Sequence, residues 1–204
     1  MQYSYTIFGV ASDNDMKRNV KSQSERRTET QAAVLRSACK LFGSNGYDRT
    51  SLQDIAADCG TTIRPIYHYF QNKKFLFEVV TETYENQLVE ALSLVDSQPE
   101  GNSSAEDYWL AFSHLATDAA FRQVVLVDAP HILGRERWAN TIVVKKASEI
   151  IQQRFPVLQM TNRTLFTRML IGALSEAVMV FAEARDSEGE DLLKQVSALV
   201  RALT

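Results

Sequence analysis

The sequence has little of what builds strands, membrane spans or secretion signals. Gly and Pro are scarce, with eight and four in 204 residues, and runs that alternate apolar with polar residues are missing. No unbroken run of about 18 apolar residues occurs, so we expect no helix that crosses a membrane. The first residues also lack the basic start and long apolar stretch of a signal peptide, so we expect a cytoplasmic protein.

The chain is equally poor in metal ligands and thiols. Its two cysteines, Cys39 and Cys59, form neither a disulfide framework nor a metal-ligand spacing. We interpret both as small buried hydrophobes, and nothing supports a redox switch. The potential ligands of the second half are His114, Asp128, His131 and Glu136. No pair of them has the i, i+4 spacing that places two ligands on one helix face, so we expect no metal and no cofactor.

What is present is an ordinary globular composition with an uneven charge. Apolar residues make up 45% of the chain and charged residues 23%, which excludes a disordered chain. The net charge is −3 overall, yet residues 16–77 carry eleven Lys and Arg against five Asp and Glu. A small module with a net charge of +6 is either a solvated basic face or a surface that binds phosphates.

The pattern predicts an all-α protein, because apolar residues recur with a period of 3.6 from residue 28 to the end. Expected helices span about 28–44, a short segment after Ser51, Thr62 to about Phe70, and one from Asn72 or Lys73 to about 96. Five more are expected at 105–117, 119–127, 135–155, 161–184 and 188–203. Breaks are expected at Asp128-Ala129-Pro130 and before Pro156.

Cap signals support the short helices near the N-terminus. Asn45-Gly46 ends the first helix, and Ser51 with Asp54 forms a capping box for the second. Gly60 breaks the chain before Thr62, which can cap the third helix. Pro65 is then the third helical residue, where a missing N–H has no intrahelical acceptor to lose. A similar box, Ser103 with Glu106, is expected before the helix at 105–117.

This arrangement is the helix-turn-helix pattern, and it resembles a known family. Residues 50–74 read TSLQDIAADCGTTIRPIYHYFQNKK, similar to the DNA-binding signature of TetR-family transcriptional regulators. The shared features are a Thr/Ser start, an Ile-Ala pair, a Gly turn, a Tyr-x-x-Phe end and a Lys three residues later. LFGSNGYDRTS at 41–51 extends the match, and DAPHILGRERW at 128–138 is a weaker one. The family often has His before the final Phe, where this chain has Tyr69.

The resemblance implies an organisation in three parts. Residues 1–27 would be a flexible extension, 28–72 the helix-turn-helix domain with its motif at about 51–70, and 73–204 a helical effector-binding and dimerisation domain. The partners it implies are a double-stranded DNA operator, an unidentified small-molecule effector, and a second copy bound through the last two helices. We expect Phe166, Leu170 and Leu174 at that dimer contact. The function implied is a ligand-responsive repressor without catalytic residues.

We expect the third helix to enter the major groove. Arg64 can donate two hydrogen bonds to guanine, and Ile63 and Pro65 can contact thymine methyls. Phosphate contacts are expected from residues with hydroxyl or ammonium donors: Thr50, Thr62, Tyr67, Tyr69 and Lys73. Gln53 and His68 could serve either role.

The basic segment before the first helix has two interpretations. It contains Lys17, Arg18, Lys21, Arg26 and Arg27. These residues could form an arm in the minor groove or a solvated tail. Residues 1–15 look unlike the N-termini of the family, so we expect Met16 to be the natural start.

Four residues are candidates for an effector pocket: Trp109, Phe112, His131 and Trp138. Aromatic residues at helical spacing are more often core than pocket, so each could also be simple packing. Two other classes of protein remain open. One is an all-helical enzyme or small-molecule carrier whose basic front is incidental, and the other is an architectural protein that binds DNA without an effector.

Overall fold

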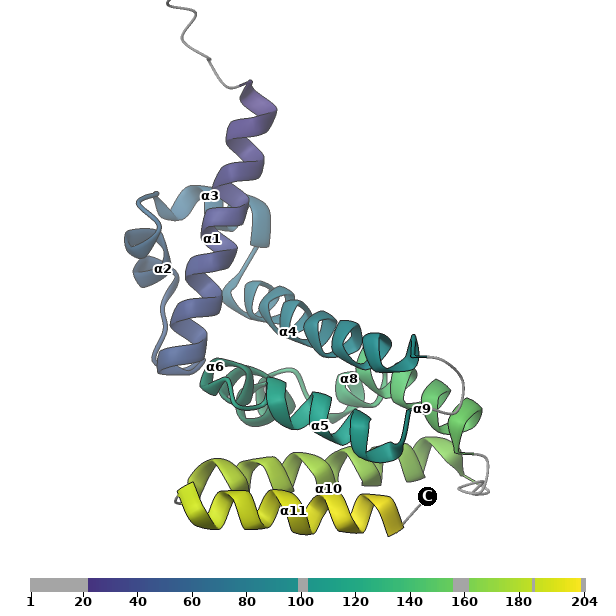
Figure 1. Ribbon diagram of the computed structural model, residues 1–204. Coiled ribbons are helices and arrows are strands. Elements are labelled where there is room, and N and C mark those ends of the chain that lie inside the picture. Colours follow the sequence, from purple (N-terminus) through teal and green to yellow (C-terminus); the bar gives the residue numbers. More distant parts are fainter. Residues whose placement is uncertain (1–21, 99–102, 156–161, 185, 203–204) are drawn as a thin grey trace, which may run out of the picture.

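The computed structural model describes residues 22–98, 103–155, 162–184 and 186–202, and all regular structure in these ranges is helical. The first four helices are α1 Gln23–Asn45, α2 Leu52–Asp58, α3 Ile63–Phe70 and α4 Lys73–Asp96. The next are α5 Ala105–Leu115, α6 Ala119–Phe121, the π-helix η1 Arg122–Asp128, α7 Ala129–Ile132 and α8 Arg135–Ala139. The last are α9 Ile142–Arg154, α10 Arg163–Glu183 and α11 Asp186–Ala202. Helices α1–α3 form one end of the molecule, α10 and α11 lie side by side at the other, and α4 runs between them (Figure 1).

Helix α1 begins five residues earlier than expected. The reason is a capping box that the apolar pattern did not reveal: the Ser22 hydroxyl accepts from the Glu25 N–H at 3.2 Å, and the Ser22 N–H donates to Glu25 at 2.6 Å. Arg26 and Arg27 are therefore exposed residues of α1, so the expected extension over residues 1–27 is wrong at its last five positions. Met16, Lys17, Arg18 and Lys21 lie outside the described residues.

The caps of the short helices are confirmed. Helix α1 ends before Gly46, whose φ of 79° is costly for residues with a Cβ. The Ser51 hydroxyl accepts from the Asp54 N–H at 3.1 Å, and the Ser51 N–H donates to Asp54 at 2.9 Å. Thr62 is the N-cap of α3, although its side chain makes no capping hydrogen bond. Pro65 is the third residue of α3, as predicted.

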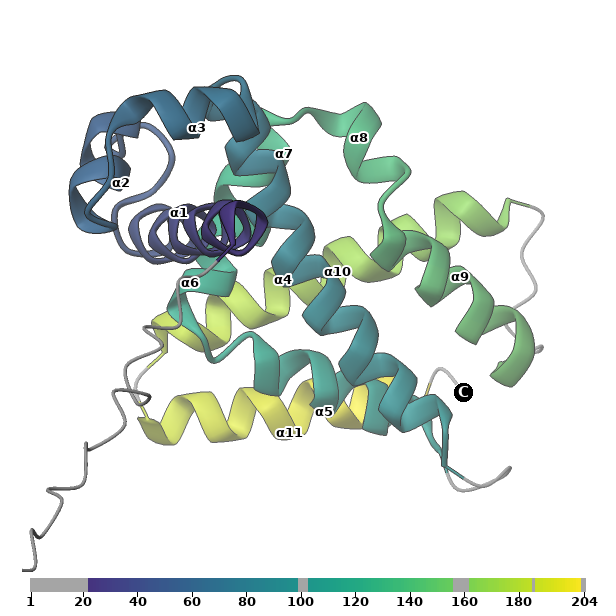
Figure 2. The ribbon, with the colours of Figure 1, turned by 90° about the horizontal axis from the view of Figure 1, so that it is seen from above.

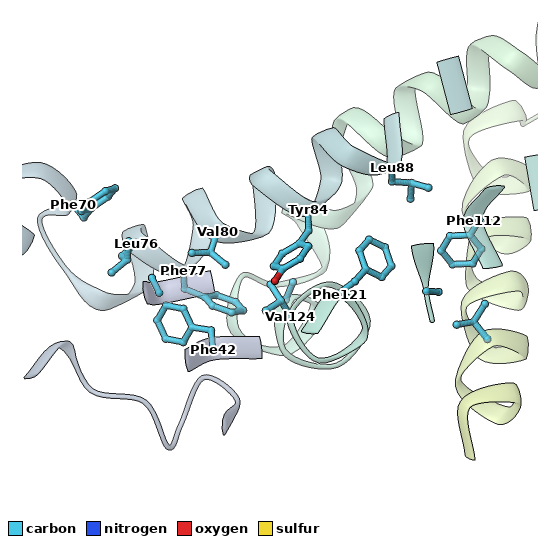
Figure 3. Close-up of a cluster of buried hydrophobic side chains, with 14 of the residues drawn as sticks. Phe42, Phe70, Leu76, Phe77, Val80, Tyr84, Leu88, Phe112, Phe121 and Val124 are labelled. Carbon is cyan, nitrogen blue, oxygen red and sulfur yellow. The ribbon is translucent and has the colours of Figure 1, made fainter. Parts of the chain in front are cut away.

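Helix α4 carries a core that continues from one end of the molecule to the other. Its first turns bury Leu76, Phe77 and Val80, and Phe77 packs edge-on against Phe42 of α1 with ring centroids 5.2 Å apart. Further along, Tyr84 packs against Phe121 at 6.2 Å (Figure 3). The buried apolar side chains from Val34 to Val200 form one cluster. The two expected domains therefore share a core rather than being joined by a linker.

The middle of the chain differs from the prediction in three places. The box before α5 is Ser104 with Asp107, one residue later than expected. The chain does not break at Pro130: η1 leads directly into α7, and Pro130 is the second residue of α7. The helix expected over 135–155 is instead two, because the Thr141 hydroxyl accepts from the Val144 N–H at 3.2 Å and starts α9. Pro156 lies outside the described residues.

Helix α10 is more apolar than the sequence prediction allowed. Its segment Thr164–Glu183 has a mean hydropathy of 1.6, so by length and composition alone it could cross a membrane, and only 11% of its most apolar window is buried. One helix of this length and composition does not indicate a membrane protein, so the prediction that no helix crosses a membrane is not contradicted. Large apolar side chains on the outside of α10 and α11 are Leu165, Met169, Val180 and Leu199.

The contact between α1 and α6 gives a test of this packing. A Cβ on Gly43 would lie 2.4 Å from the Cβ of Ala120, a separation that atoms cannot adopt. Gly43→Val should therefore force the two helices apart and lower the free energy of unfolding by about 1–3 kcal/mol, measured by urea denaturation. Adding Ala120→Gly should recover part of the loss. Independent, additive effects of the two substitutions would contradict this contact.

Candidate nucleic-acid interface and ligand cavity

The exposed side of α3 collects the side chains expected to meet DNA. Ile66 and Phe70 are buried, whereas Arg64, Tyr67 and His68 are exposed. Positions 64, 67 and 68 are spaced i, i+3 and i+4, so their side chains share one face of the helix. Tyr67 is 52% exposed, which is unusual for a large aromatic residue without a ligand. Helices α2 and α3 lie together at one edge of the molecule when it is seen from above (Figure 2).

The other residues predicted to contact DNA differ in how far they are exposed to solvent. Gln53 on α2 and Thr62 before α3 are exposed, and the Thr62 hydroxyl is not used as a cap. Ile63, Pro65 and Tyr69 are half-buried. The Tyr69 ring lies edge-on to His68, with centroids 5.0 Å apart. These side chains can border a groove-binding surface, while Ile63 and Tyr69 also pack against the core.

The predicted phosphate contact of Thr50 is not supported by its position. Its side chain is 1% exposed, and its hydroxyl contacts the Leu41 carbonyl at 3.1 Å and the Gly46 carbonyl at 2.9 Å. The single O–H therefore donates to one of these carbonyls or is shared between them, at the end of a helix where acceptors are left unpaired. The expectation that it donates to phosphate is wrong.

Lys73 at the start of α4 has a partner that the sequence did not suggest. Its ammonium lies 4.1 Å from the centre of the Tyr47 ring, a cation–π contact. The Tyr47 ring also packs edge-on against Phe77, with centroids 5.0 Å apart. This contact leaves the ammonium's hydrogens free to donate, so it positions Lys73 without neutralising its charge. Nearby Lys40, in contrast, is paired with Asp58, and that hydrogen bond holds the pKa of Asp58 below its usual range.

The segment 128–138 connects this surface to the interior of the second half. The Asp128 carboxylate accepts from the backbone N–H of Tyr47 at 2.8 Å, across 81 residues of sequence. Arg137 donates to both carboxylate oxygens of Glu85 on α4, at 2.8 and 3.2 Å, and lies 3.4 Å from Glu78. Glu85 is 4% exposed. A buried carboxylate needs such a pair, so α8 is fixed to α4 at this point.

Three adjoining cavities lie in the second half. The inner chamber, of about 130 Å³, is bounded by α4, α5, α9, α10 and α11, and Trp109 and Phe112 line it. The neck, of about 30 Å³, is lined by Phe112, Trp138 and the Arg137–Glu85 pair, among others. The outer cavity, of about 240 Å³, is lined by Trp138 and Arg168 with five smaller or apolar residues. Trp109, Phe112 and Trp138 therefore line these cavities.

Two groups of predicted residues do not have the expected positions. His131 is exposed and lines none of the three cavities, because it lies on the outer side of the short helix α7, so its place in an effector pocket was wrong. Phe166, Leu170 and Leu174 line the inner chamber. The side of α10 that carries these three residues therefore faces the chamber. Apolar residues occur on both sides of this helix, so the sequence alone could not distinguish its inner side from its outer side.

The His, Cys, Asp and Glu side chains are the potential metal ligands in the part of the chain that the structure describes. No cluster of three or more His, Cys, Asp or Glu side chains with metal-binding geometry occurs there. Burial raises the pKa of the Cys39 thiol to about 11, so the reactive thiolate is scarce at neutral pH. Cys39 and Cys59 are both half-buried rather than fully buried.

Comparison with known proteins matches both halves. The model of bacterial regulatory proteins of the tetR family matches residues 34–80, and a tetracyclin repressor-like C-terminal domain matches residues 105–204. The chain belongs to the TetR family. It is thus a transcriptional regulator with a helix-turn-helix DNA-binding region and an all-α fold. The predicted family and fold class are confirmed.

Individual relatives agree with the TetR assignment. The chain is 29% identical over 99 residues to the HTH-type transcriptional repressor ComR of Escherichia coli K12, covering 48% of this chain and 47% of ComR. It is 32% identical over 66 residues to the uncharacterized HTH-type transcriptional regulator YxaF of Bacillus subtilis, covering 32% of this chain and 35% of YxaF. The chain thus spans half or less of the length of the curated relatives it matches.

Solved TetR-family structures share the whole architecture. A TetR-family regulator from Pectobacterium atrosepticum superposes with a TM-score of 0.60 at 25% identity, over 90% of this chain and 95% of that one. A structure assigned to the same family from Shewanella sp. PV-4 gives a TM-score of 0.69 at 22% identity, over 85% and 96% of the two chains. The second likeness concerns the fold alone.

Arg64 is exposed at the start of α3. Two substitutions can distinguish its predicted hydrogen bonds to guanine from the general attraction of its charge to DNA. Arg64→Ala should weaken binding to the best operator by about 1–3 kcal/mol. Arg64→Lys should keep the affinity for scrambled DNA while losing preference at one base pair, because an ammonium cannot donate two parallel hydrogen bonds. Binding isotherms on both DNAs test this. Unchanged base preference in both variants would show that another side chain reads this position.

Lys73 should behave as a phosphate-binding residue. Lys73→Ala should weaken binding about equally on all sequences and reduce the slope of log affinity against log salt by about 0.9 for each phosphate that the variant no longer neutralises. Salt titrations measured by fluorescence anisotropy provide the slope. Lys194→Ala, an exposed lysine of α11 paired with Asp191, is the control and should leave the slope unchanged. If Lys73→Ala and the wild type give the same salt slope, Lys73 contacts Tyr47 but no phosphate.

Proposed function

We propose that this protein is a ligand-responsive repressor that binds a palindromic operator as a homodimer. The observation that supports it best is the exposed row of Arg64, Tyr67 and His68 on α3, which belongs to the segment 16–77 with a net charge of +6. A cation and an aromatic residue exposed on one face of this helix suit a major groove. ComR, which matches about half of the chain, is named a repressor. Such a protein acts where the DNA is, so we expect it in the cytoplasm and without catalytic activity.

The DNA contacts divide into reading and positioning. We propose that Arg64 reads a base and that Ile63 and Pro65 meet thymine methyls at the edge of the same face. Thr62, Tyr67, Tyr69 and Lys73 would hold phosphates, and the unused Thr62 hydroxyl supports this.

Gln53 and His68 are both exposed and keep both possible roles.

The uncovered face of α10 and α11 supports dimerisation. Leu165, Met169 and Leu199 are 52%, 64% and 65% exposed, and only 11% of the most apolar window of α10 is buried. Large apolar side chains that gather on one exposed surface are normally covered by a partner. We propose that a second copy covers it, so that α10 and α11 form a four-helix bundle with their symmetry mates. A membrane is the other possible cover, and the test below separates the two.

We propose that residues 73–204 form the effector-binding and dimerisation domain and that 128–138 couples it to DNA binding. Trp138 of this segment lines the neck and the outer cavity, Arg137 holds α4, and Asp128 holds Tyr47. A ligand that moves Trp138 would therefore act on the contact that positions the DNA-binding end. The coupling is a free energy between two sites, so DNA should weaken ligand binding by the same factor.

Selection from random duplex DNA tests the function as a whole. The purified protein should enrich a palindrome with half-sites about one helical turn apart. Its affinity for that site should exceed that for scrambled DNA by about a thousandfold or more at physiological salt. An enzyme or carrier with an incidental basic front would enrich no sequence. An architectural protein would bind with strong salt dependence and no palindrome.

Dimerisation should depend on the outward side of α10 and α11. Met169→Glu combined with Leu199→Glu should give monomers by analytical ultracentrifugation and abolish specific DNA binding, because charges cannot be buried in an apolar interface. Leu94→Glu is the matched control, since Leu94 on α4 is 70% exposed and lies outside the proposed interface. It should remain dimeric. A wild-type protein that is monomeric in buffer and partitions into lipid vesicles would favour the membrane.

Asp128 should separate binding from coupling. Asp128→Ala removes the acceptor of the Tyr47 N–H, so both sites should persist while their linkage weakens. We expect operator and ligand affinities within about tenfold of wild type, and a ligand-induced loss of DNA affinity that is reduced by about fivefold or more, which is the range of typical coupling energies. Competition anisotropy on operator DNA measures all three quantities. Full ligand response in this variant would place the coupling in α4 alone.

A further inference from the structure

The three cavities lie side by side and share lining residues. Leu88, Phe112, Val143 and Ile171 line both the inner chamber and the neck. Val125, Leu126, Trp138 and Ser175 line both the neck and the outer cavity. The shared lining residues place each space next to its neighbour, so an elongated molecule that displaces the side chains between them would span all three.

The lining of the inner chamber is almost entirely apolar. Its lining is made of aliphatic and aromatic side chains, and the Tyr108 hydroxyl is already bonded to Asp96 at 3.2 Å. The indole N–H of Trp109 is buried without a partner, a single weak exception. An apolar cavity of about 150 Å³ stays dry and binds benzene, so the 130 Å³ here suits an alkyl segment of similar bulk. Charge cannot be accommodated at this end.

The neck restricts the shape of the ligand. Its volume of about 30 Å³ is close to the share of one water molecule in the liquid. The rigid Arg137–Glu85 pair forms part of its wall. So small a space accommodates few heavy atoms, and we take an unbranched chain as the ligand segment that needs the least displacement of the wall.

The outer cavity is lined by one arginine, Arg168, and by no acidic residue. The Arg168 guanidinium lies 5.4 Å from the centre of the Trp138 ring, and its Nε is buried without a hydrogen-bond partner. Other cations near the cavities are compensated: Arg137 by Glu85 and Glu78, and Lys146 and Arg154 by Asp96. Within the described ranges no ion pair to Arg168 occurs. The side chain is half-buried, and a cation that is partly removed from water without an acid is stabilised when an anion joins it.

We propose that the ligand is an unbranched aliphatic carboxylate. Its carboxylate pairs with Arg168, with the Ser175 hydroxyl as a second donor, and its chain passes along the neck into the inner chamber. This assignment rests on the proposed function only in taking the ligand to be the effector. The binding site itself follows from the cavities and from Arg168.

Titration of the full chain without DNA tests the proposal. Hexanoate, octanoate and decanoate are compared with the matching primary alcohols by calorimetry and by the fluorescence of the two tryptophans, which line the inner chamber and the outer cavity. Each added methylene should strengthen binding by about fourfold until the chamber is full. Each carboxylate should bind about tenfold or more tightly than its alcohol.

Variants of Arg168 assign the charge. Arg168→Gln should abolish the preference for carboxylate over alcohol, and Arg168→Lys should retain part of it, provided that thermal unfolding shows both to be folded. Lys145→Gln removes an exposed cation of α9 that lines none of the cavities, and it should change nothing.

Several outcomes would overturn the proposal: no binding of any carboxylate, equal affinity for acids and alcohols, or no dependence on chain length. If the folded Arg168→Gln protein keeps the preference for carboxylate, Arg168 has a structural role instead. If it keeps that preference and also becomes monomeric, Arg168 belongs to the dimer contact. Failure of the proposed function is distinct from these. A protein that binds octanoate through Arg168 but never releases DNA would retain the ligand and lose the regulatory role.

Discussion

The shared use of helix α4 by both halves of the molecule is the constraint on which the rest depends. Its first turns bury Leu76, Phe77 and Val80 against the DNA-binding end, and its later turns place Glu85 and Leu88 beside the cavities. The helix is 24 residues long without a break, and a packed helix moves as a unit. A change in the volume of the cavities therefore cannot be confined to them.

A single helix would still allow the two ends to pivot, and a second contact restricts this. The Asp128 carboxylate bonds to the Tyr47 backbone, and the Tyr47 ring in turn supports Lys73, the first residue of α4. The segment that carries Asp128 also carries Arg137 and Trp138, which line the neck. Cavity, coupling segment and proposed phosphate contact are thus neighbours in space, although they are far apart in the sequence. Packed side chains and hydrogen bonds of this kind are what carry a coupling energy between two sites.

Local rules predicted the DNA-binding end well and the second half poorly. Ser51, Gly60 and Pro65 define short helices through their own backbone preferences, so the sequence suffices there. Thr50 was misassigned because its hydroxyl bonds to a carbonyl nine residues away. Phe166 and Met169 look alike in an apolar pattern, and only packing shows that one lines a cavity and the other faces outward. The role of Arg168 could not be predicted either, because it depends on the absence of an acid in three dimensions.

Hydrogen exchange at the Tyr47 amide tests most directly whether the two halves are held as one unit. This amide lies in the loop between α1 and α2, where exchange would be fast if its bond to Asp128 opened on its own. The account predicts that in the free protein it exchanges as slowly as the core amides of α4, since both open only in global unfolding. Exchange at a loop-like rate, with α4 still protected, would contradict it and show two ends that move independently.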